Sequence, residues 1–212
     1  MTNCKVGEIV YLKDVSIFGN ETASFFAKKY DVDRDTPYFE KNFRLWSEYR
    51  ESCLDVDGRA PNLSDGFTEG MFCLATGSVR YQNLTSEKKK ELGFFRCAQK
   101  LSNSSIDTYN PERGEGEQQK STIMDYDCSS FGPNSKQDVI YFMHFYRGGN
   151  ALDGSFDLYR IENDVLQSTI IKEDGTTFAD KKTTGQRPHF CLIKKVIEPN
   201  NIKPIRTNVK LW

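Results

Sequence analysis

Short runs of alternating apolar and polar residues, separated by turn residues, recur along the second half of the chain. The clearest runs cover residues 138–147 and 155–162, with two glycines and an asparagine at 148–150 between them. Within 138–147 both alternating sets are largely apolar, so we expect a central strand that packs on both faces. A third run at 121–129 precedes them across a short Gly-Pro-Asn turn. Three such strands joined by turns predict an antiparallel meander.

The first half of the chain carries weaker strand patterns and one candidate helix. Residues 38–54 place aromatic side chains at helical spacing, which predicts a short amphipathic helix or a 3₁₀ turn. Segments 55–66 and 110–120 are polar and contain glycine, so we expect loops there. Residues 165–184 fit either a helix or a hairpin. The remaining candidate strands are 6–12, 67–75, 77–83 and 93–101.

These segments together predict a mainly β protein, a closed antiparallel β-barrel with short helical segments. Such a barrel needs about eight short strands, and its interior can hold one small ligand. We expect an N-terminal arm (1–40), a barrel (41–191) and a C-terminal tail (192–212). The arm carries apolar side chains that we expect to be exposed and to meet a partner protein. They are Phe25, Phe26, Tyr38 and Phe39.

Charge and hydropathy argue against a nucleic-acid-binding protein and against a transmembrane helix. The 29 basic and 30 acidic residues nearly cancel, so we expect no nucleic-acid partner. No apolar run reaches the roughly 18 residues that a transmembrane helix needs. The N-terminus lacks the apolar core of a signal peptide, so an exported protein would have lost its targeting segment before residue 1 of this numbering.

Six cysteines are well separated along the chain, and no two of them form a CxxC pair. With only two histidines, the usual ligand spacing of a metal site is missing, so we expect none. An even number of cysteines is typical of disulfides in an oxidising compartment, and four Asn-x-Ser/Thr sequons agree with export. Free thiols in a reducing compartment are the alternative.

The run at 141–171 resembles the lipocalin domain of the violaxanthin de-epoxidase family. The matching residues are Phe145-Tyr146-Arg147-Gly148, Asn150, Asp153-Gly154, Tyr159, Val165-Leu166 and Ile170-Ile171. Gly93-Phe94-Phe95-Arg96 with Gln99-Lys100 fits another strand of that domain, and Trp46 and Cys73 match a family tryptophan and a strand cysteine. The resemblance implies a lipocalin-like barrel with an N-terminal arm.

The resemblance also implies site residues. Family catalysis is attributed to an Asp and a Tyr inside the barrel, which correspond to Asp125 (or Asp127) and Tyr146. A carboxylic acid with a raised pKa in an apolar barrel would protonate an epoxide oxygen. Solvated carboxylates are the alternative, because one face of any strand points outward. We expect Phe142, Tyr146 and Tyr159 to contact the ligand.

Lipocalin geometry, in which the tail returns past the first strands of the barrel, implies two disulfides. Cys73 would bridge Cys191, and Cys4 would bridge Cys128. Six cysteines allow 15 complete pairings, so the sequence does not determine the rest.

Two departures from the family argue against catalysis. Residues 1–40 contain one cysteine in place of a cysteine-rich domain, and no titratable side chain lies within three residues after Cys73. We therefore predict a non-catalytic, carotenoid- or lipid-binding accessory subunit of a photosynthetic membrane complex in the chloroplast thylakoid lumen, without ascorbate-driven turnover. The alternatives are a true xanthophyll de-epoxidase that uses ascorbate and a secreted ligand-binding lipocalin outside plastids.

Overall fold

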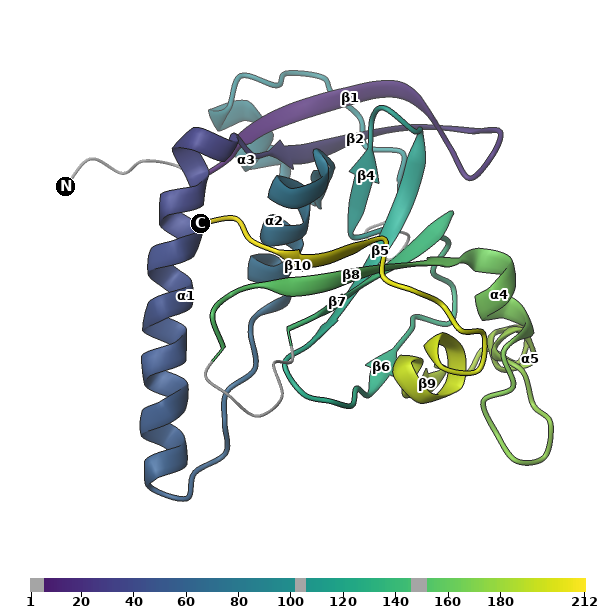
Figure 1. Cartoon of the computed structure of the whole chain (residues 1–212). Coiled ribbons are helices and arrows are strands. Elements are labelled where there is room, and N and C mark those ends of the chain that lie inside the picture. The colour runs from purple at the N-terminus through teal and green to yellow at the C-terminus, as the bar shows by residue number, and fades with distance from the viewer. Residues whose placement is uncertain (1–5, 102–105, 146–151) are drawn as a thin grey trace.

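The computed structural model describes residues 6–101, 106–145 and 152–212. Strands and helices alternate along the chain, and most strands belong to a single mixed sheet (Figure 1). The strands are β1 (Glu8–Ile17), β2 (Glu21–Lys29), β3 (Val79–Gln82), β4 (Thr108–Asn110), β5 (Glu115–Thr122), β6 (Ser129–Ser130), β7 (Val139–His144), β8 (Phe156–Glu162), β9 (His189–Phe190) and β10 (Arg206–Val209). The helices are α1 (Val32–Asp55), α2 (Asp65–Thr76), α3 (Ser86–Glu91), α4 (Asn163–Ser168), α5 (Phe178–Thr183) and the π-helix η1 (Ile193–Ile197).

The main sheet is open, so the predicted lipocalin-like antiparallel barrel is wrong. Its 8 strands have the order β1-β2-β3-β4-β5-β7-β8-β10, and within the described residues no ladder joins the outer strands β1 and β10. β5 and β7 run parallel, whereas every other pair in this sheet is antiparallel. A parallel pair requires a crossover connection, which a simple meander does not contain.

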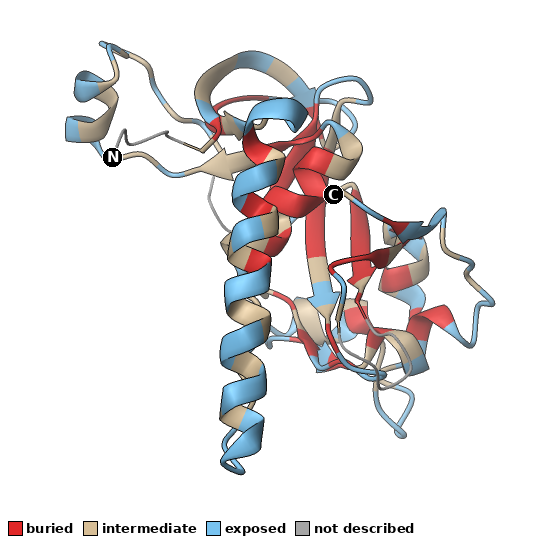
Figure 2. Ribbon diagram, turned by 60° about the vertical axis from the view of Figure 1, so that its left-hand side comes forward, coloured by how far each residue is buried: buried red, intermediate tan, exposed pale blue. Residues whose placement is uncertain are grey.

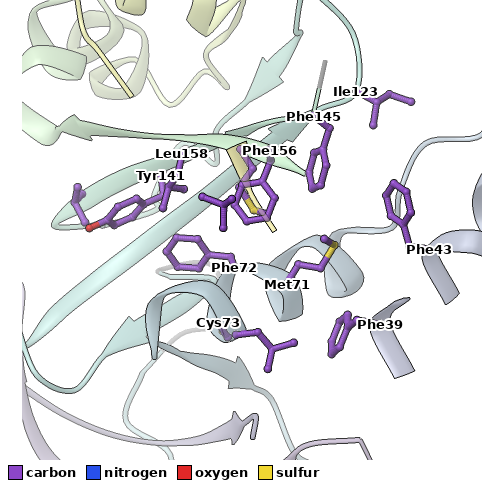
Figure 3. Packing of buried hydrophobic residues seen from close by; sticks show 14 residues of the cluster. Phe39, Phe43, Met71, Phe72, Cys73, Ile123, Tyr141, Phe145, Phe156 and Leu158 are labelled. Carbon is purple, nitrogen blue, oxygen red and sulfur yellow. The ribbon is translucent and has the colours of Figure 1, made fainter. Parts of the chain in front are cut away.

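Helices cover both faces of the sheet, and this covering explains why its central strand is apolar on both sides. Val139, Tyr141 and Met143 of β7 pack in one cluster with buried residues of α1 and α2, and Figure 3 shows Tyr141 of this cluster beside Phe72 of α2. Ile140 and Phe142 face the other way, into a cluster with α4, α5 and η1. The same alternation that suggested a barrel interior therefore belongs to the middle layer of a helix–sheet–helix arrangement.

α1 and α2 form for different local reasons. The carboxylate of Asp31 caps α1 by accepting a hydrogen bond from the N–H of Arg34 at 2.8 Å, and Phe39 and Phe43 bury one face of the helix. α2 replaces the strand predicted at 67–75. Its residues from Met71 through Leu74 are all buried, so it shows no amphipathic period that would distinguish it from a strand.

The segments predicted as an arm and a tail take part in the sheet. Residues of the predicted arm form β1, β2 and the first turns of α1, and β10 in the predicted tail pairs with β8. Phe25, Phe26 and Phe39 are buried and only Tyr38 of that group is exposed. The expected apolar docking patch on the arm is therefore wrong, because strand pairing and α2 cover three of its four side chains.

Strands were predicted correctly in two apolar segments, whereas the polar strand β5 was predicted as a loop. The strands predicted at 138–147 and 155–162 are confirmed over 139–144 and 156–162 as the antiparallel pair β7 and β8, and residues 146 and 147 lie outside the described residues. The loop predicted at 110–120 is wrong, because its second half is β5, and the run at 121–129 is mostly irregular. In the described part of the chain, no helix is long and apolar enough to cross a bilayer.

Candidate functional site

A cleft of about 720 Å³ opens between the end of β5 and the first turns of α2. Part of its wall is the loop after α1, which contributes Arg59 and Asn62, and another part is the segment 121–130 with Arg187. Other charged and amide side chains that line it are Asp65, Glu69, Asp107, Gln119 and Lys120. Charged groups of both signs in one concave site are typical of a binding or catalytic centre.

Strand pairing between β4 and β5 brings an aspartate, an amide and a lysine together. The register pairs Thr108 with Glu117, so Asp107 lies opposite Gln118 at the next position. The Gln118 amide donates to Asp107 Oδ2, and the backbone N–H of Gln119 donates to the same oxygen at 2.9 Å. Lys120 follows Gln118 by two residues and therefore lies on the same face of β5.

α2 supplies a second carboxylate. Glu69 lies in the first half of this helix, and its side chain is only 13% exposed. The guanidinium of Arg80, on the neighbouring strand β3, forms an ion pair with Glu69. Arg80 thus fixes the direction of Glu69 toward the cleft that Asp107 also lines.

The cleft holds its negative charge at an energetic cost. Burial raises the pKa of Glu69 to about 7, repulsion from Asp107 and Asp65 adds to the rise, and Arg80 opposes it. Burial also raises the pKa of Asp107, against the attraction of Lys120 and the Gln119 N–H. A cation placed beside these carboxylates would relieve both effects, because an adjacent opposite charge favours the ionised form.

The donor set fits a hard divalent cation such as Mg²⁺. Within the described residues, no three His, Cys, Asp or Glu side chains form a ready-made metal site. Mg²⁺ does not require one, since it keeps several waters and is typically held by one or two carboxylates plus phosphates of the substrate. Asp107 and Glu69 are the two carboxylates that would hold it.

Two other acids, Glu115 and Glu117 of β5, form ion pairs with arginines outside the cleft. Glu117 is fully buried on the opposite face of the strand, where it accepts a hydrogen bond from Thr108 Oγ1 at 2.8 Å and pairs with Arg113 at 3.0 Å. Glu115 pairs with Arg160 at 2.8 Å. These ion pairs support the sheet, and neither Glu115 nor Glu117 lines the cleft, whose acids are Asp65, Glu69, Asp107 and Asp127.

Two arginines on the cleft wall have exposed side chains. Arg59 and Arg187 line the cleft, and among the residues that the structure describes neither forms an ion pair with a carboxylate. A guanidinium matches the geometry of a phosphate group and is always charged. Together with Lys120 they make part of the wall positive although the whole chain is nearly neutral.

Among the described residues predicted from the lipocalin resemblance to form the catalytic and ligand site, Asp127 lines this cleft, whereas Asp125, Phe142 and Tyr159 do not. Asp125 is exposed in the segment after β5, and Tyr146 lies outside the described residues. Phe142 is buried in the core, and the partly buried Tyr159 packs beside it with ring centroids 6.1 Å apart. Asp127 is buried and accepts hydrogen bonds from the N–H groups of Leu192 at 3.0 Å and Ile193 at 3.1 Å, so it caps the helical turn there.

The cysteines that the structure describes are free thiols. Cys73 is buried in α2, and Cys191 donates to Asp127 at 3.0 Å. Cys128 lies 3.2 Å from His189 Nε2. All five described cysteines are free, so the predicted Cys73–Cys191 bridge is not formed, because α2 buries Cys73 in the core beside the sheet and Cys191 belongs to the β9 end. Cys4, the predicted partner of Cys128, lies outside the described residues.

Two carboxylates and a lysine, in a cleft that two exposed arginines also line, are side chains of the kind that cation-assisted chemistry on phosphate esters uses. The comparisons with known proteins agree with this class. The family model described as Bsp6I restriction endonuclease matches residues 30–199, and the chain belongs to this family. A curated relative, the type II restriction enzyme Bsp6I of Bacillus sp. (strain RFL6), is 26% identical over 168 residues, which cover 78% of this chain and 82% of the relative. No solved structure matches significantly.

This family membership overturns the resemblance to violaxanthin de-epoxidase and everything that depended on it. The predicted accessory function, the alternative de-epoxidase activity, the photosynthetic partners and the thylakoid location are wrong. The exclusion of a nucleic-acid partner is wrong as well. It rested on net charge, which sums over the whole surface and hides a positive wall beside acidic groups. The carotenoid and ascorbate came from the same resemblance, and neither is proposed here.

Sequence reasoning missed Glu69, Asp107, Gln118 and Lys120. One signal was available in the segment 115–122, where polar residues follow one another without a turn residue after Gly116. A polar strand buried in the middle of a sheet is unusual and marks a functional site. Nothing in the spacing indicated that Glu69, far earlier in the chain, would join them.

Proposed function

We propose that this chain is a divalent-cation-dependent endonuclease that hydrolyses phosphodiester bonds of double-stranded DNA. The observation that carries the proposal is the hydrogen bond from Gln118 to Asp107, with Lys120 on the same face of β5, where Asp107 and Lys120 line a cleft that the exposed Arg59 and Arg187 also line. Family membership and the relative's name, a type II restriction enzyme, support the choice of DNA as the substrate.

Different side chains of the site have different roles in phosphodiester hydrolysis. In this reaction water forms a bond to phosphorus, the ester P–O bond breaks, and a phosphate monoester and a hydroxyl result. A bound Mg²⁺ supplies Lewis-acid stabilisation of the negative charge on the phosphate. Lys120 lies beside Asp107 and adds a positive charge for the transition state. Gln118 and the Gln119 N–H orient the Asp107 carboxylate, and Arg80 orients Glu69.

The direct test is incubation of the purified chain with long linear duplex DNA and MgCl₂. We expect discrete fragments that reproduce from one DNA preparation to the next, and complete inhibition by EDTA. A set of long DNAs of differing sequence, tested with both Mg²⁺ and Mn²⁺, guards against a missing recognition sequence. Intact DNA in every one of these reactions would refute the proposal.

The stability of the metal-free protein should fall as the pH rises from about 4.5 to about 7. The folded state keeps a proton on Glu69 in this window, since its pKa rises from 4.5 to about 7, whereas the unfolded chain has already lost that proton. A shift of this size corresponds to roughly 3 kcal/mol of unfolding free energy. Urea unfolding across the pH range measures it.

The cation should reverse this loss, because it binds the deprotonated carboxylates. The melting temperature should therefore rise more on adding MgCl₂ at pH 8 than at pH 5.5. Asp107→Asn should remove most of the difference, and Glu173→Gln, a change at an exposed carboxylate outside the cleft lining, should preserve it. Equal gains at the two pH values would contradict the assignment of Asp107 and Glu69 as cation ligands.

Arg59→Ala and Arg187→Ala should each weaken DNA binding. If each guanidinium contacts one phosphate, the slope of log affinity against log salt should fall by about one for each substitution. Fluorescence anisotropy with a labelled duplex in Ca²⁺-free, EDTA-containing buffer separates binding from cleavage. Arg96→Ala, at an exposed arginine outside the cleft lining, is the matched control. Unchanged salt slopes in both cleft variants would place the DNA elsewhere.

A further inference from the structure

The small sheet of β6 and β9 carries two cysteines at one of its ends. The two strands pair in antiparallel register, with Ser129 opposite Phe190 (Figure 1). Continued by one residue, this register places Cys128 opposite Cys191. Cys128 is exposed and lines the cleft, and Cys191 is partly buried.

The hydrogen bonds of this ladder indicate how closely the two cysteines approach each other. The N–H of Phe131 donates to the carbonyl oxygen of Pro188 at 3.0 Å, so these two residues form a hydrogen-bonded pair. Hydrogen-bonded and non-hydrogen-bonded pairs alternate along an antiparallel ladder, so Cys128 and Cys191, three positions away, are a pair of the non-hydrogen-bonded type. The Cα atoms of such a pair are about 4.5 Å apart, and a disulfide spans Cα distances of roughly 4.4–6.8 Å.

The side chains of both cysteines belong to the exposed face of this sheet. Buried residues gather where strands and helices meet (Figure 2), and Ser129 and Phe190 are among them, whereas Cys128 and His189 are exposed. Cys128 Sγ lies 3.2 Å from His189 Nε2, a contact between diagonal neighbours on one face. Residues two positions apart in a strand share a face, so Cys191 lies on the same face as His189.

Each of the two thiols has a proton acceptor beside it. In the His189 tautomer with its proton on Nδ1, Nε2 accepts the thiol proton of Cys128. Cys191 donates to Asp127 Oδ1 at 3.0 Å. A neighbouring base promotes the thiolate, which is the reactive form of cysteine. The other described cysteines lie in three separate segments, with Cys53 in α1, Cys73 in α2 and Cys97 after α3.

We propose that Cys128 and Cys191 form a thiol pair that hydrogen peroxide converts into a disulfide on the wall of the cleft. The sulfur of Cys128, the exposed thiol, bonds to one peroxide oxygen while the O–O bond breaks, and the other oxygen leaves as water with the proton that His189 accepted. The sulfur of Cys191 then bonds to the sulfur of Cys128, the S–O bond breaks, and a second water leaves with the proton of the Cys191 thiol. The two thiols lose two electrons, which the peroxide gains.

The disulfide would tie two segments that line or adjoin the cleft. Residues 121–130 form part of the cleft lining, and the bridge would fix their end to β9. Asp127 would lose the S–H donor of Cys191 but keep the N–H donors of Leu192 and Ile193. The inference is independent of the proposed function, because it concerns thiols and can be tested without DNA.

The first test maps the bridge in the full chain. The reduced protein is treated with hydrogen peroxide, its remaining thiols are alkylated, and trypsin is added. We expect the chain to become lighter by two hydrogens before alkylation. Peptides 121–136 and 183–194 should then appear joined, and a reducing agent should separate them.

Single substitutions identify the two sulfurs. Cys128→Ser and Cys191→Ser should each abolish the joined peptides, whereas Cys97→Ser, at a partly buried cysteine outside the pair, should preserve them. Circular dichroism should show that each variant is folded. A bridge from Cys128 to another cysteine such as Cys4, or oxidation of Cys128 to a sulfinic acid while Cys191 stays a thiol, would overturn the proposal.

The second test concerns His189 as the proton acceptor. His189→Asn should slow disulfide formation by about tenfold, because asparagine cannot take the proton of the Cys128 thiol. The alkylation rate of Cys97 in the same sample is the control and should not change. An unchanged rate of disulfide formation in this variant would overturn the role assigned to His189.

Discussion

Replacing Asp107 by Asn is expected to reduce the rate of DNA cleavage by at least about 10³-fold, which is about 4 kcal/mol of transition-state stabilisation. The side chain keeps its size and one acceptor oxygen for the Gln119 N–H, so the pairing of β4 with β5 is preserved. It loses the charge that would hold the cation. Single-turnover cleavage of a labelled duplex at saturating protein measures the effect.

The same substitution should leave the fold intact or stabilise it. Repulsion from Asp107 helps to raise the pKa of Glu69, so removing that charge relieves strain at pH 8. DNA affinity in EDTA should be equal or tighter, because one negative charge leaves a surface that contacts phosphates. Cleavage within tenfold of the wild-type rate, in a variant with normal melting and normal DNA affinity, would exclude Asp107 from the reaction.

Replacing Lys120 by Met should slow cleavage by about 10²- to 10³-fold, a typical cost of removing one group that stabilises charge in a transition state. The aliphatic part of the side chain stays in place, because Lys120 Nζ lies 5.3 Å from the centre of the Phe131 ring and a methionine can pack there equally well. The melting temperature should therefore change little. Rapid-quench kinetics at saturating protein separate this loss from any loss of affinity.

Two further variants show whether the charge of Lys120 is the cause. Lys120→Arg retains a positive charge and should recover part of the rate, although its planar group cannot occupy the same point. Lys203→Met, at an exposed lysine outside the cleft lining, should cleave like the wild type. If Lys120→Met cleaves as fast as Lys203→Met, the ammonium has no part in the reaction.

Secondary structure could be predicted where burial imposes a strong pattern. The apolar runs of β7 and β8 contain no residue that interrupts a strand, and the spacing of Phe39 and Phe43 marks the buried face of α1. α2 was predicted as a strand because a short helix that is buried on most sides has no polar face. β5 was predicted as a loop because its polar residues line the candidate site or form ion pairs with neighbouring residues.

The count of cysteines led to a wrong prediction of disulfides, and the charge balance led to a wrong exclusion of nucleic acid. An even count of cysteines agrees with disulfides, but the same count agrees with thiols that burial or hydrogen bonds already satisfy, such as Cys73 and Cys191. Equal numbers of acidic and basic residues say nothing about where each sign gathers. Both quantities are totals over the chain, whereas binding depends on a few side chains in one place.

The sequence by itself determined the central strands β7 and β8 and their antiparallel pairing, since both depend on neighbours within a few positions. It predicted only a short helix or turn at 38–54, where the structure has the 24-residue helix α1. The tertiary structure decided whether the sheet closes, which strands run parallel and which polar residues meet. Asp107 and Gln118 become partners only through the register of β4 and β5, and Glu69 reaches the cleft that Asp107 lines from a different element, α2. Residues that meet from distant segments leave no local pattern in the sequence, so the candidate site could be recognised only from the folded structure.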